Sequence, residues 1–328
     1  MKTIARLFLS AATLFAAAGS VQAQSPSVVA SIKPVHSLVA AIMQGVGEPA
    51  LIVDGAASPH TYSMKPSKAA LLQDANMVFW VGPGLEAFLG KPLQSLGASA
   101  VVVELEDAPG LEKLKFREGG AFEAHDHGDH EAQEAHHEEG EHAHEQEDGH
   151  DHDHGGFDMH LWLDPANAKA MAAEIERKLS AADAANAATY KANLATLDAK
   201  LDALDAEIAE TVAPIKEKPF IVFHDAYQYF EHRYGLRVAG SITVSPETMP
   251  GAERISEIHK KIGDLGATCV FAEPQFEPKL VNVVIEGTPA RSGTLDPEAA
   301  TLTEGPELYF DLMKGLAGSL KECLATEG

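Results

Sequence analysis

The alternation of short apolar runs with helical patterns constrains the fold of this chain more than any other feature. In the first third of the chain, β-branched runs at Ser27–Ile32, Ala50–Val53, Met77–Val81 and Ala100–Leu105 alternate with helical patterns at 33–43, 65–74 and 84–96. The apolar runs are nearly continuous, which is typical of parallel strands that are covered on both faces. We therefore predict a first α/β lobe over residues 24–118.

A second series of the same kind begins near residue 219. Strand-like runs at Phe220–Phe223, Val238–Val244 and Thr268–Ala272 alternate with helical patterns at 225–234, 251–265, 277–286 and 307–324. This series predicts a second α/β lobe over residues 219–328. The chain is long for a single hydrophobic core, and its length also favours two domains.

The two series are separated by residues 157–218, which contain a long helical pattern. Asp164 and Pro165 suit the N-cap and first position of a helix. The stretch 186–209 has apolar residues at spacings of three and four, and as a helix it would span ~36 Å. The stretch has fewer than the three to four clean heptads that a coiled coil needs, so a coiled-coil dimer is the weaker alternative. The predicted fold class is α/β, with two similar parallel-sheet lobes joined by one long helix.

Residues 119–156 interrupt this pattern with a histidine-rich acidic segment. Between Ala121 and His154 there are ten His and thirteen Asp or Glu, and there is no Lys or Arg. Imidazole and carboxylate together bind divalent metals, and the segment has too few apolar residues to form a core. We predict a metal-binding loop that is disordered without metal. The alternative is a solvated acidic linker.

The ends and the charge of the chain indicate an exported protein. Residues 1–23 contain basic Lys2 and Arg6, an apolar run and small residues before Ala23, which is typical of a cleaved signal peptide. A membrane anchor would need ~20 apolar residues, and this run is shorter. The formal net charge is −24, of which about −11 lies outside the histidine-rich segment. This acidity argues against nucleic acid or anionic lipid as partners and suits the capture of cations.

The chain has only two cysteines, Cys269 and Cys323. In an oxidising compartment, one disulfide between them is the expected state. Two buried free thiols are the alternative.

Six histidines lie outside the histidine-rich segment, and their contexts differ. His60 follows a predicted strand in a turn-rich loop, His224 ends another strand, and His160 lies between the lobes just before a helix. Ligands of open α/β sheets bind beyond the carboxyl ends of the strands, so these three could converge between the lobes. Three neutral imidazoles and one oxygen suit Zn²⁺. Of the other three, His36 is predicted to be structural, and His232 and His259 are predicted to face solvent.

Several stretches of the chain resemble one known family. They are SIKPVHSLVAAI, SPHTYSMKPSKAALLQDANMVFWVGPGLEAF, DMHLWLDPANA, FHDAYQYFEHRYGL, FAEPQF and GTLDPEA, and they cover nearly the whole mature chain. The chain is similar to the cluster A-I metal-binding proteins of ABC importers, the ZnuA-type periplasmic zinc-uptake subunits. The resemblance implies two lobes joined by a rigid helix, with Zn²⁺ in the cleft between them. It also implies metal-ligand roles for His60, His160 and His224, and it supports the disulfide.

The resemblance leaves the fourth ligand open. Several family members have a Glu before the first histidine, but here that position is Pro59. Members that bind manganese or iron have a carboxylate in the last lobe, and the matching residue is Asp296. We expect water as the fourth ligand and keep Asp296 as the alternative, since it could also cap the following turn or hold a ligand histidine.

These observations predict a periplasmic protein that binds Zn²⁺ with high affinity. The expected partners are an inner-membrane ABC permease and, indirectly, its ATPase, with a periplasmic zinc chaperone as a further candidate and a monomer as the expected state. The histidine-rich loop would collect or sense zinc at lower affinity. The alternatives are a carrier of manganese or another divalent metal and a periplasmic zinc buffer. A zinc hydrolase, with Glu273 as the nearest general base, is less favoured because the chain has no HExxH motif and no nucleophile elbow.

Overall fold

The computed structural model describes residues 25–117 and 156–325, apart from residues 244, 247–248 and 267–268. The predicted signal peptide and nearly all of the predicted histidine-rich loop lie outside the described residues. No helix in the described part of the chain combines the length and the apolarity that a membrane span needs.

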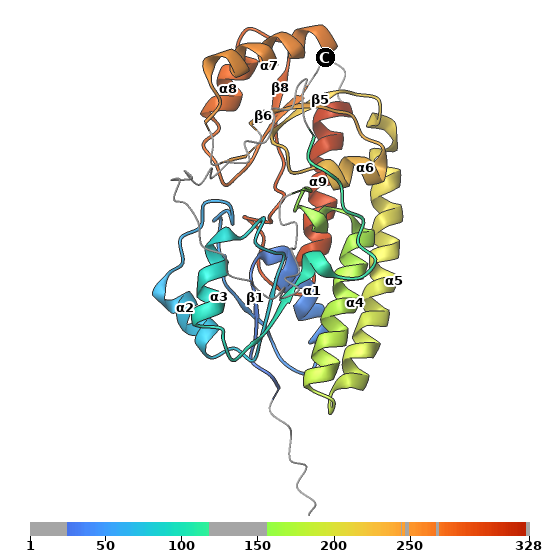
Figure 1. Cartoon of the computed structure of the whole chain (residues 1–328). Helices are drawn as coiled ribbons and strands as arrows, with labels where there is room; N and C mark the ends of the chain where they lie inside the picture. Colours follow the sequence, from blue (N-terminus) through green and yellow to red (C-terminus); the bar gives the residue numbers. More distant parts are fainter. Residues whose placement is uncertain (1–24, 118–155, 244, 247–248, 267–268, 326–328) are drawn as a thin grey trace, which may run out of the picture.

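The N-terminal lobe is a parallel sheet with helices packed around it (Figure 1). Its strand order is β2-β1-β3-β4, and every pair is parallel. The elements, which match the predicted series closely, are β1 (Val28–Ala30), α1 (Lys33–Ile42), β2 (Ala50–Leu51), α2 (Pro66–Gln73), β3 (Met77–Trp80), α3 (Gly90–Ser95) and β4 (Val101–Glu104). The predicted helix at 84–96 is shorter than expected, because it divides into a 3₁₀ turn (Ala87–Leu89) and α3.

The C-terminal lobe repeats this arrangement. Its order is β6-β5-β7-β8, again with parallel pairs throughout. Its elements are β5 (Phe220–His224), α6 (Gln228–Tyr234), β6 (Val238–Thr243), α7 (Ala252–Leu265), β7 (Cys269–Ala272), α8 (Lys279–Ile285) and β8 (Arg291–Thr294). The sequence did not predict β8, because its residues are mostly exposed and RSGT has no apolar side chain. The two similar parallel sheets confirm the predicted fold class.

The long helical region between the lobes breaks once. α4 (Pro165–Ala182) ends at Asp183, and α5 (Ala187–Val212) follows after a short turn and lies along α4 (Figure 1). As predicted, Asp164 caps α4, since its carboxylate accepts a hydrogen bond from the Ala166 N–H at 2.8 Å. At the break, the Tyr190 hydroxyl donates to Asp183 at 2.8 Å.

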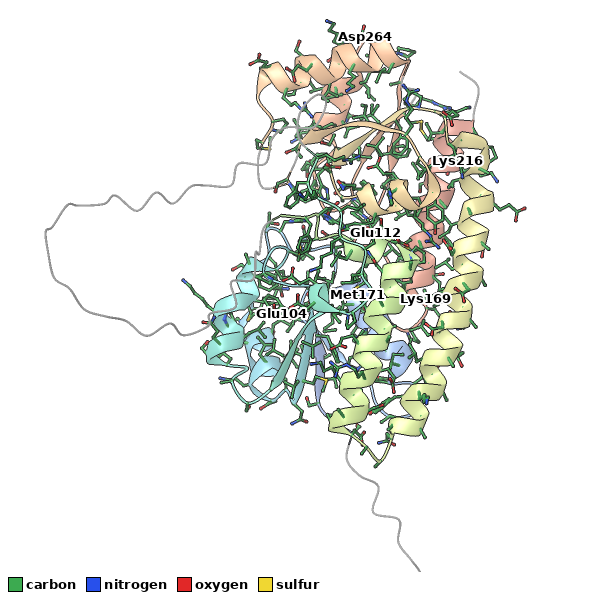
Figure 2. The ribbon with its side chains drawn as sticks, turned by 45° about the vertical axis from the view of Figure 1, so that its right-hand side comes forward. Glu104, Glu112, Lys169, Met171, Lys216 and Asp264 are labelled. Carbon is green, nitrogen blue, oxygen red and sulfur yellow. A yellow bond between two sulfur atoms is a disulfide. The ribbon has the colours of Figure 1, made fainter. Side chains whose placement is uncertain are left out.

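α5 runs alongside both lobes (Figure 1). Figure 2 shows Lys216, just past the end of α5, beside the C-terminal lobe. The apolar stripe of α5 is buried within the chain itself, at Tyr190, Leu197, Leu201, Leu204 and Ile208. This stripe therefore packs along the protein's own two lobes, as expected. The last helix, α9 (Leu308–Ala325), lies beside α5 and also contacts α1.

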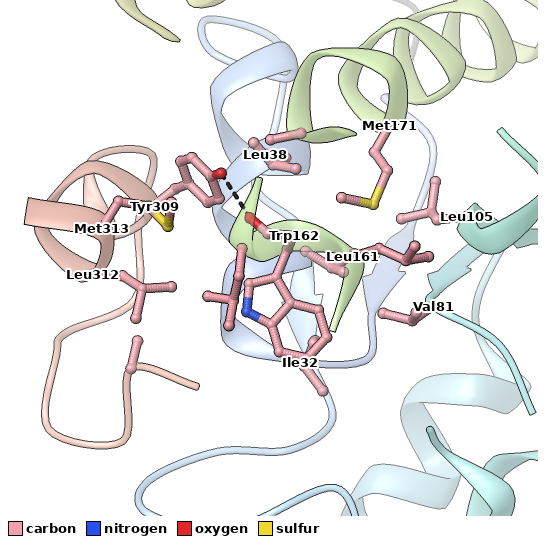
Figure 3. Close-up of a cluster of buried hydrophobic side chains, with 14 of the residues drawn as sticks. Ile32, Leu38, Val81, Leu105, Leu161, Trp162, Met171, Tyr309, Leu312 and Met313 are labelled. Atoms are coloured by element: carbon pink, nitrogen blue, oxygen red, sulfur yellow. Dashed lines mark hydrogen bonds between the residues drawn. The ribbon is translucent and has the colours of Figure 1, made fainter. Parts of the chain in front are cut away.

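One hydrophobic core continues from the N-terminal lobe into the C-terminal lobe. It includes Trp162, in the 3₁₀ turn Leu161–Leu163 just before α4, and the indole of this residue is fully buried. In Figure 3 the hydroxyl of Tyr309, on α9, points at the Trp162 backbone, where it donates to the carbonyl at 2.7 Å. The lobes therefore share buried apolar contacts in addition to the connecting helix.

The predicted disulfide between Cys269 and Cys323 is present. Cys269 begins β7 and Cys323 lies in the last turns of α9. The bond therefore ties the final helix to the C-terminal sheet.

Candidate metal centre

Three histidines from distant parts of the chain converge at one point between the lobes. His60 lies in the loop after β2, His160 precedes the 3₁₀ turn before α4, and His224 is the last residue of β5. The Nε2 atom of His160 is 3.3 Å from the Nε2 atoms of both His60 and His224. One nitrogen from each ring lies within 4.8 Å of the other two. Two nitrogens bound to one tetrahedral Zn²⁺ ion would be ~3.4 Å apart, so this spacing fits such an ion.

The ring of His160 is oriented by Asp158, which the sequence analysis did not single out. The buried Asp158 carboxylate accepts hydrogen bonds from the His160 Nδ1–H at 2.7 Å and from its backbone N–H at 3.0 Å. The carboxylate has no proton to donate, so Nδ1 carries the hydrogen and Nε2 keeps its lone pair for a metal. The Tyr229 hydroxyl holds this segment by donating to the Asp158 carbonyl at 2.7 Å.

The ring of His224 is oriented in the same way by Glu273. The His224 Nδ1–H lies 2.8 Å and 2.7 Å from the two Glu273 oxygens. The Tyr227 hydroxyl also donates to Glu273, at 3.2 Å. Glu273 is thus the partner of a histidine, and its position does not support the general-base role that a hydrolase would need. His224 ends β5 and Glu273 follows β7, and the pairing of these two strands in the sheet brings the side chains together. The sequence placed both residues at the ends of predicted strands, but it did not show that the strands pair.

The surroundings of the site shift the pKa values of two of the rings in opposite directions. Burial holds the pKa of His60 well below its usual value of 6.5, and the other two imidazoles lower it further. Burial also disfavours the protonated form of His224, but the Glu273 carboxylate beside Nδ1, aided by Asp225 and Asp158, outweighs this effect and raises the pKa. His60 is therefore held neutral and ready to ligate, whereas His224 must release a proton at a higher pH.

Asp296, the candidate fourth ligand, is not part of the three-histidine group, and its carboxylate is engaged in other hydrogen bonds. Its Oδ1 accepts from the Gln275 side-chain amide at 2.9 Å and from the backbone N–H of Glu298 at 3.4 Å. Asp296 thus caps the turn that follows it, which was the structural role considered from the sequence. Within the described residues, the group of possible metal ligands at this point consists of the three histidines alone.

Glu298 is a carboxylate near the site that the sequence analysis did not consider. It is 6% exposed, and its Oε1 lies 4.0 Å from His60 Nε2. Ser58, two residues before His60, donates to the same oxygen at 3.4 Å. The GTLDPEA stretch at 293–299 contains both acids, but only the tertiary path of the loop shows which one approaches the rings.

The three remaining histidines within the described residues lie outside this group. His36 is buried, and its Nε2 lies 3.0 Å from the Pro49 carbonyl, which fits a structural role. The His232 side chain is 56% exposed, and His259 is exposed on α7. Both exposed positions agree with the prediction.

Three neutral imidazoles with carboxylates behind two of them form a donor set that suits Zn²⁺, Cu²⁺ or Ni²⁺ better than Mn²⁺ or Mg²⁺. The rings approach from the N-terminal lobe, the segment between the lobes and the C-terminal lobe. An ion at their centre would therefore join the two halves of the molecule. The His60 side chain is 13% exposed, so the group is not completely sealed from solvent.

The sequence matches one family model and several known proteins. The model of the family "Zinc-uptake complex component A periplasmic" matches residues 28–323. The high-affinity zinc uptake system protein ZnuA of Brucella suis is 56% identical over an alignment that covers 99% of this chain and 100% of the relative. The protein of the same name from Paracoccus denitrificans is 39% identical, with 97% of each chain covered.

A solved structure shows the same fold. The crystal structure of a ZnuA protein superposes with a TM-score of 0.72 at 24% identity, and the match covers 92% of this chain and 99% of the other. The family match spans both lobes and includes all three histidines. This chain belongs to the ZnuA family, the periplasmic component A of zinc-uptake complexes.

Proposed function

We propose that this protein captures Zn²⁺ in the periplasm and delivers it to the membrane permease of an ABC importer. The observation that carries the proposal is the convergence of His60, His160 and His224, with the nitrogens at separations that fit one ion. Water would fill the fourth position. Asp158 and Glu273 hold two of the rings with Nε2 toward the ion, so little reorganisation is needed on binding.

The histidine-rich segment would serve as an auxiliary collector of zinc. A segment that must become ordered on binding loses conformational entropy, so we expect its sites to be weaker than the three-histidine site. Lys115 and Phe157, which flank the segment, form an antiparallel bridge. The chain therefore leaves and re-enters the fold at one place, and the segment can be deleted without separating its ends.

The test is a competitive zinc titration against a chelator, carried out on the mature chain and on a form that lacks residues 121–154. We expect the deletion to remove the weak sites and to leave one tight site, because His60, His160 and His224 lie outside the deletion. A tight site that disappeared with the segment would instead make this protein a zinc buffer. Sedimentation of the same samples would test the expected monomer.

The affinity for zinc should depend on pH through His224. Ligation needs a neutral imidazole, and the pKa of His224 is raised above 6.5, so protons begin to compete while the solution is still above that pH. The affinity should be greatest above the raised pKa and fall as the pH decreases through it, by up to about tenfold per pH unit for one competing proton. Titrations between pH 8 and pH 5 would measure this.

Glu273→Gln gives the matched control for the pH series. It removes the charge that raises the pKa of His224, so the decline should begin at a lower pH even though binding is weaker overall. If the affinity of the unaltered protein stayed constant down to pH 5, the role given to His224 would be wrong.

A further inference from the structure

Lys33 is buried at the start of α1, and it is 4% exposed. Among the described residues its ammonium group has no carboxylate within hydrogen-bond distance, and it forms an ion pair with Glu304 at 4.0 Å. Burying an ammonium group is costly unless its hydrogens are satisfied. Here they are satisfied by backbone: Nζ donates to the carbonyls of Ala299 at 3.0 Å, Ala300 at 3.0 Å and Leu302 at 2.8 Å.

These three carbonyls belong to a segment that has returned from the C-terminal lobe. Residues 295–302 follow β8 and lie against the N-terminal half of the chain. A second bond holds the same segment, because the Trp162 indole N–H donates to the Pro297 carbonyl at 2.8 Å. Hydrogen bonds from two side chains, Lys33 and Trp162, therefore hold the segment against the N-terminal half of the chain.

The backbone of this segment is strained at Ala299. Ala299 has a φ of +58°, in the left-handed region that residues with a Cβ rarely occupy, and its side chain is fully buried. Such a conformation persists only where the surrounding contacts impose it, and it is found most often at functional sites. The residue just before it is Glu298, whose carboxylate oxygen lies 4.0 Å from His60 Nε2.

We propose that Lys33 is a positioning residue of the zinc site, which holds the Glu298 carboxylate beside His60 so that it stabilises the bound ion. The inference rests on the proposed function. The three imidazoles are neutral when they bind Zn²⁺, so a nearby negative charge compensates the charge of the ion, either at the ion or through its bound water. Lys33 does not touch the ion, and its own positive charge is directed at the carbonyls.

A double-mutant cycle in zinc affinity tests this proposal. The variants are Lys33→Met, Glu298→Gln and the two together, titrated with Zn²⁺ against a chelator in the full mature chain. Each single change should weaken the three-histidine site by about 10- to 100-fold, the usual effect of removing a supporting carboxylate. The zinc affinity of the double variant should lie within about twofold of the affinity of the single variant that binds zinc less tightly, because both changes remove the same interaction.

A merely structural Lys33 would give a different result. The losses would then multiply, because Glu298→Gln would still have its full effect in the Lys33→Met protein. That result, or an unaltered affinity in Lys33→Met, would overturn the proposal. Should Lys33→Met fail to fold, Lys33→Arg keeps a cation whose planar group cannot converge on three carbonyls, and the same cycle applies with a smaller expected loss.

The control is Lys218→Met. Lys218 also binds a backbone carbonyl, that of Leu324 at 2.7 Å, but at the end of α9. The Lys218→Met substitution should lower the melting temperature of the metal-free protein without changing its zinc affinity. If the unaltered protein had no tight zinc site, the proposed function itself would fail, and this outcome is distinct from a tight site that ignores Lys33.

Discussion

Replacing His160 or His224 by Ala should weaken zinc binding by two to three orders of magnitude. Structural zinc sites contribute about 10–16 kcal/mol through four ligands, so the loss of one ligand is worth roughly 3 kcal/mol or more. Both rings are pre-oriented by buried carboxylates, so each variant loses a ligand that needs little reorganisation on binding. Competitive titration with a chelator would measure the effect, and circular dichroism would verify that each variant is folded.

His232→Ala is the matched control for these variants. It removes an imidazole that is 56% exposed and that lies outside the three-histidine group, so the tight site should be unaffected. Glu273→Gln should lie between the two cases, with a loss of about 10- to 100-fold. If His160→Ala or His224→Ala bound zinc as tightly as the unaltered chain, the metal would have to lie elsewhere.

Removing the disulfide should lower the free energy of unfolding by about 4 kcal/mol. The bond joins residues that are 54 positions apart, and closing a loop of that length restricts the unfolded chain by roughly this amount. Replacing both Cys269 and Cys323 by Ala avoids a free thiol and a buried hydroxyl. Urea denaturation of the metal-free oxidised protein and of the double variant would give the difference.

The same double variant should retain most of its zinc affinity, because the bond lies at the start of β7 and at the end of α9, whereas Glu273 follows the other end of β7. A loss of stability below about 1 kcal/mol would mean that the unfolded chain of the double variant is already restricted without the disulfide.

Local patterns in the sequence predicted the strands with continuous apolar runs and the long α5 stripe. These patterns are reliable because burial on both faces of a parallel strand, or on one face of a helix, requires a fixed apolar spacing. β8 was missed for the same reason: its four residues, Arg291–Thr294, are mostly exposed and hold their place by pairing with β7. The local pattern did not place the break after Ala182, where the Tyr190 hydroxyl donates to Asp183.

The candidate ligands were predictable because histidines that follow strand ends, or stand where the lobes meet, are placed by the topology of an α/β fold. The sequence by itself determined the two lobes, the three histidines and the cysteine pair. Only the tertiary structure decided that Asp158 and Glu273 orient two of the rings, and that Glu298 rather than Asp296 lies beside His60. The reason is physical: Glu298 reaches His60 because Lys33 and Trp162 hold a loop from one lobe against the other, through hydrogen bonds between residues more than a hundred positions apart. Glu273 meets His224 because β5 and β7 pair, and Asp158 meets His160 through the path of the backbone between them, and no apolar periodicity encodes either contact.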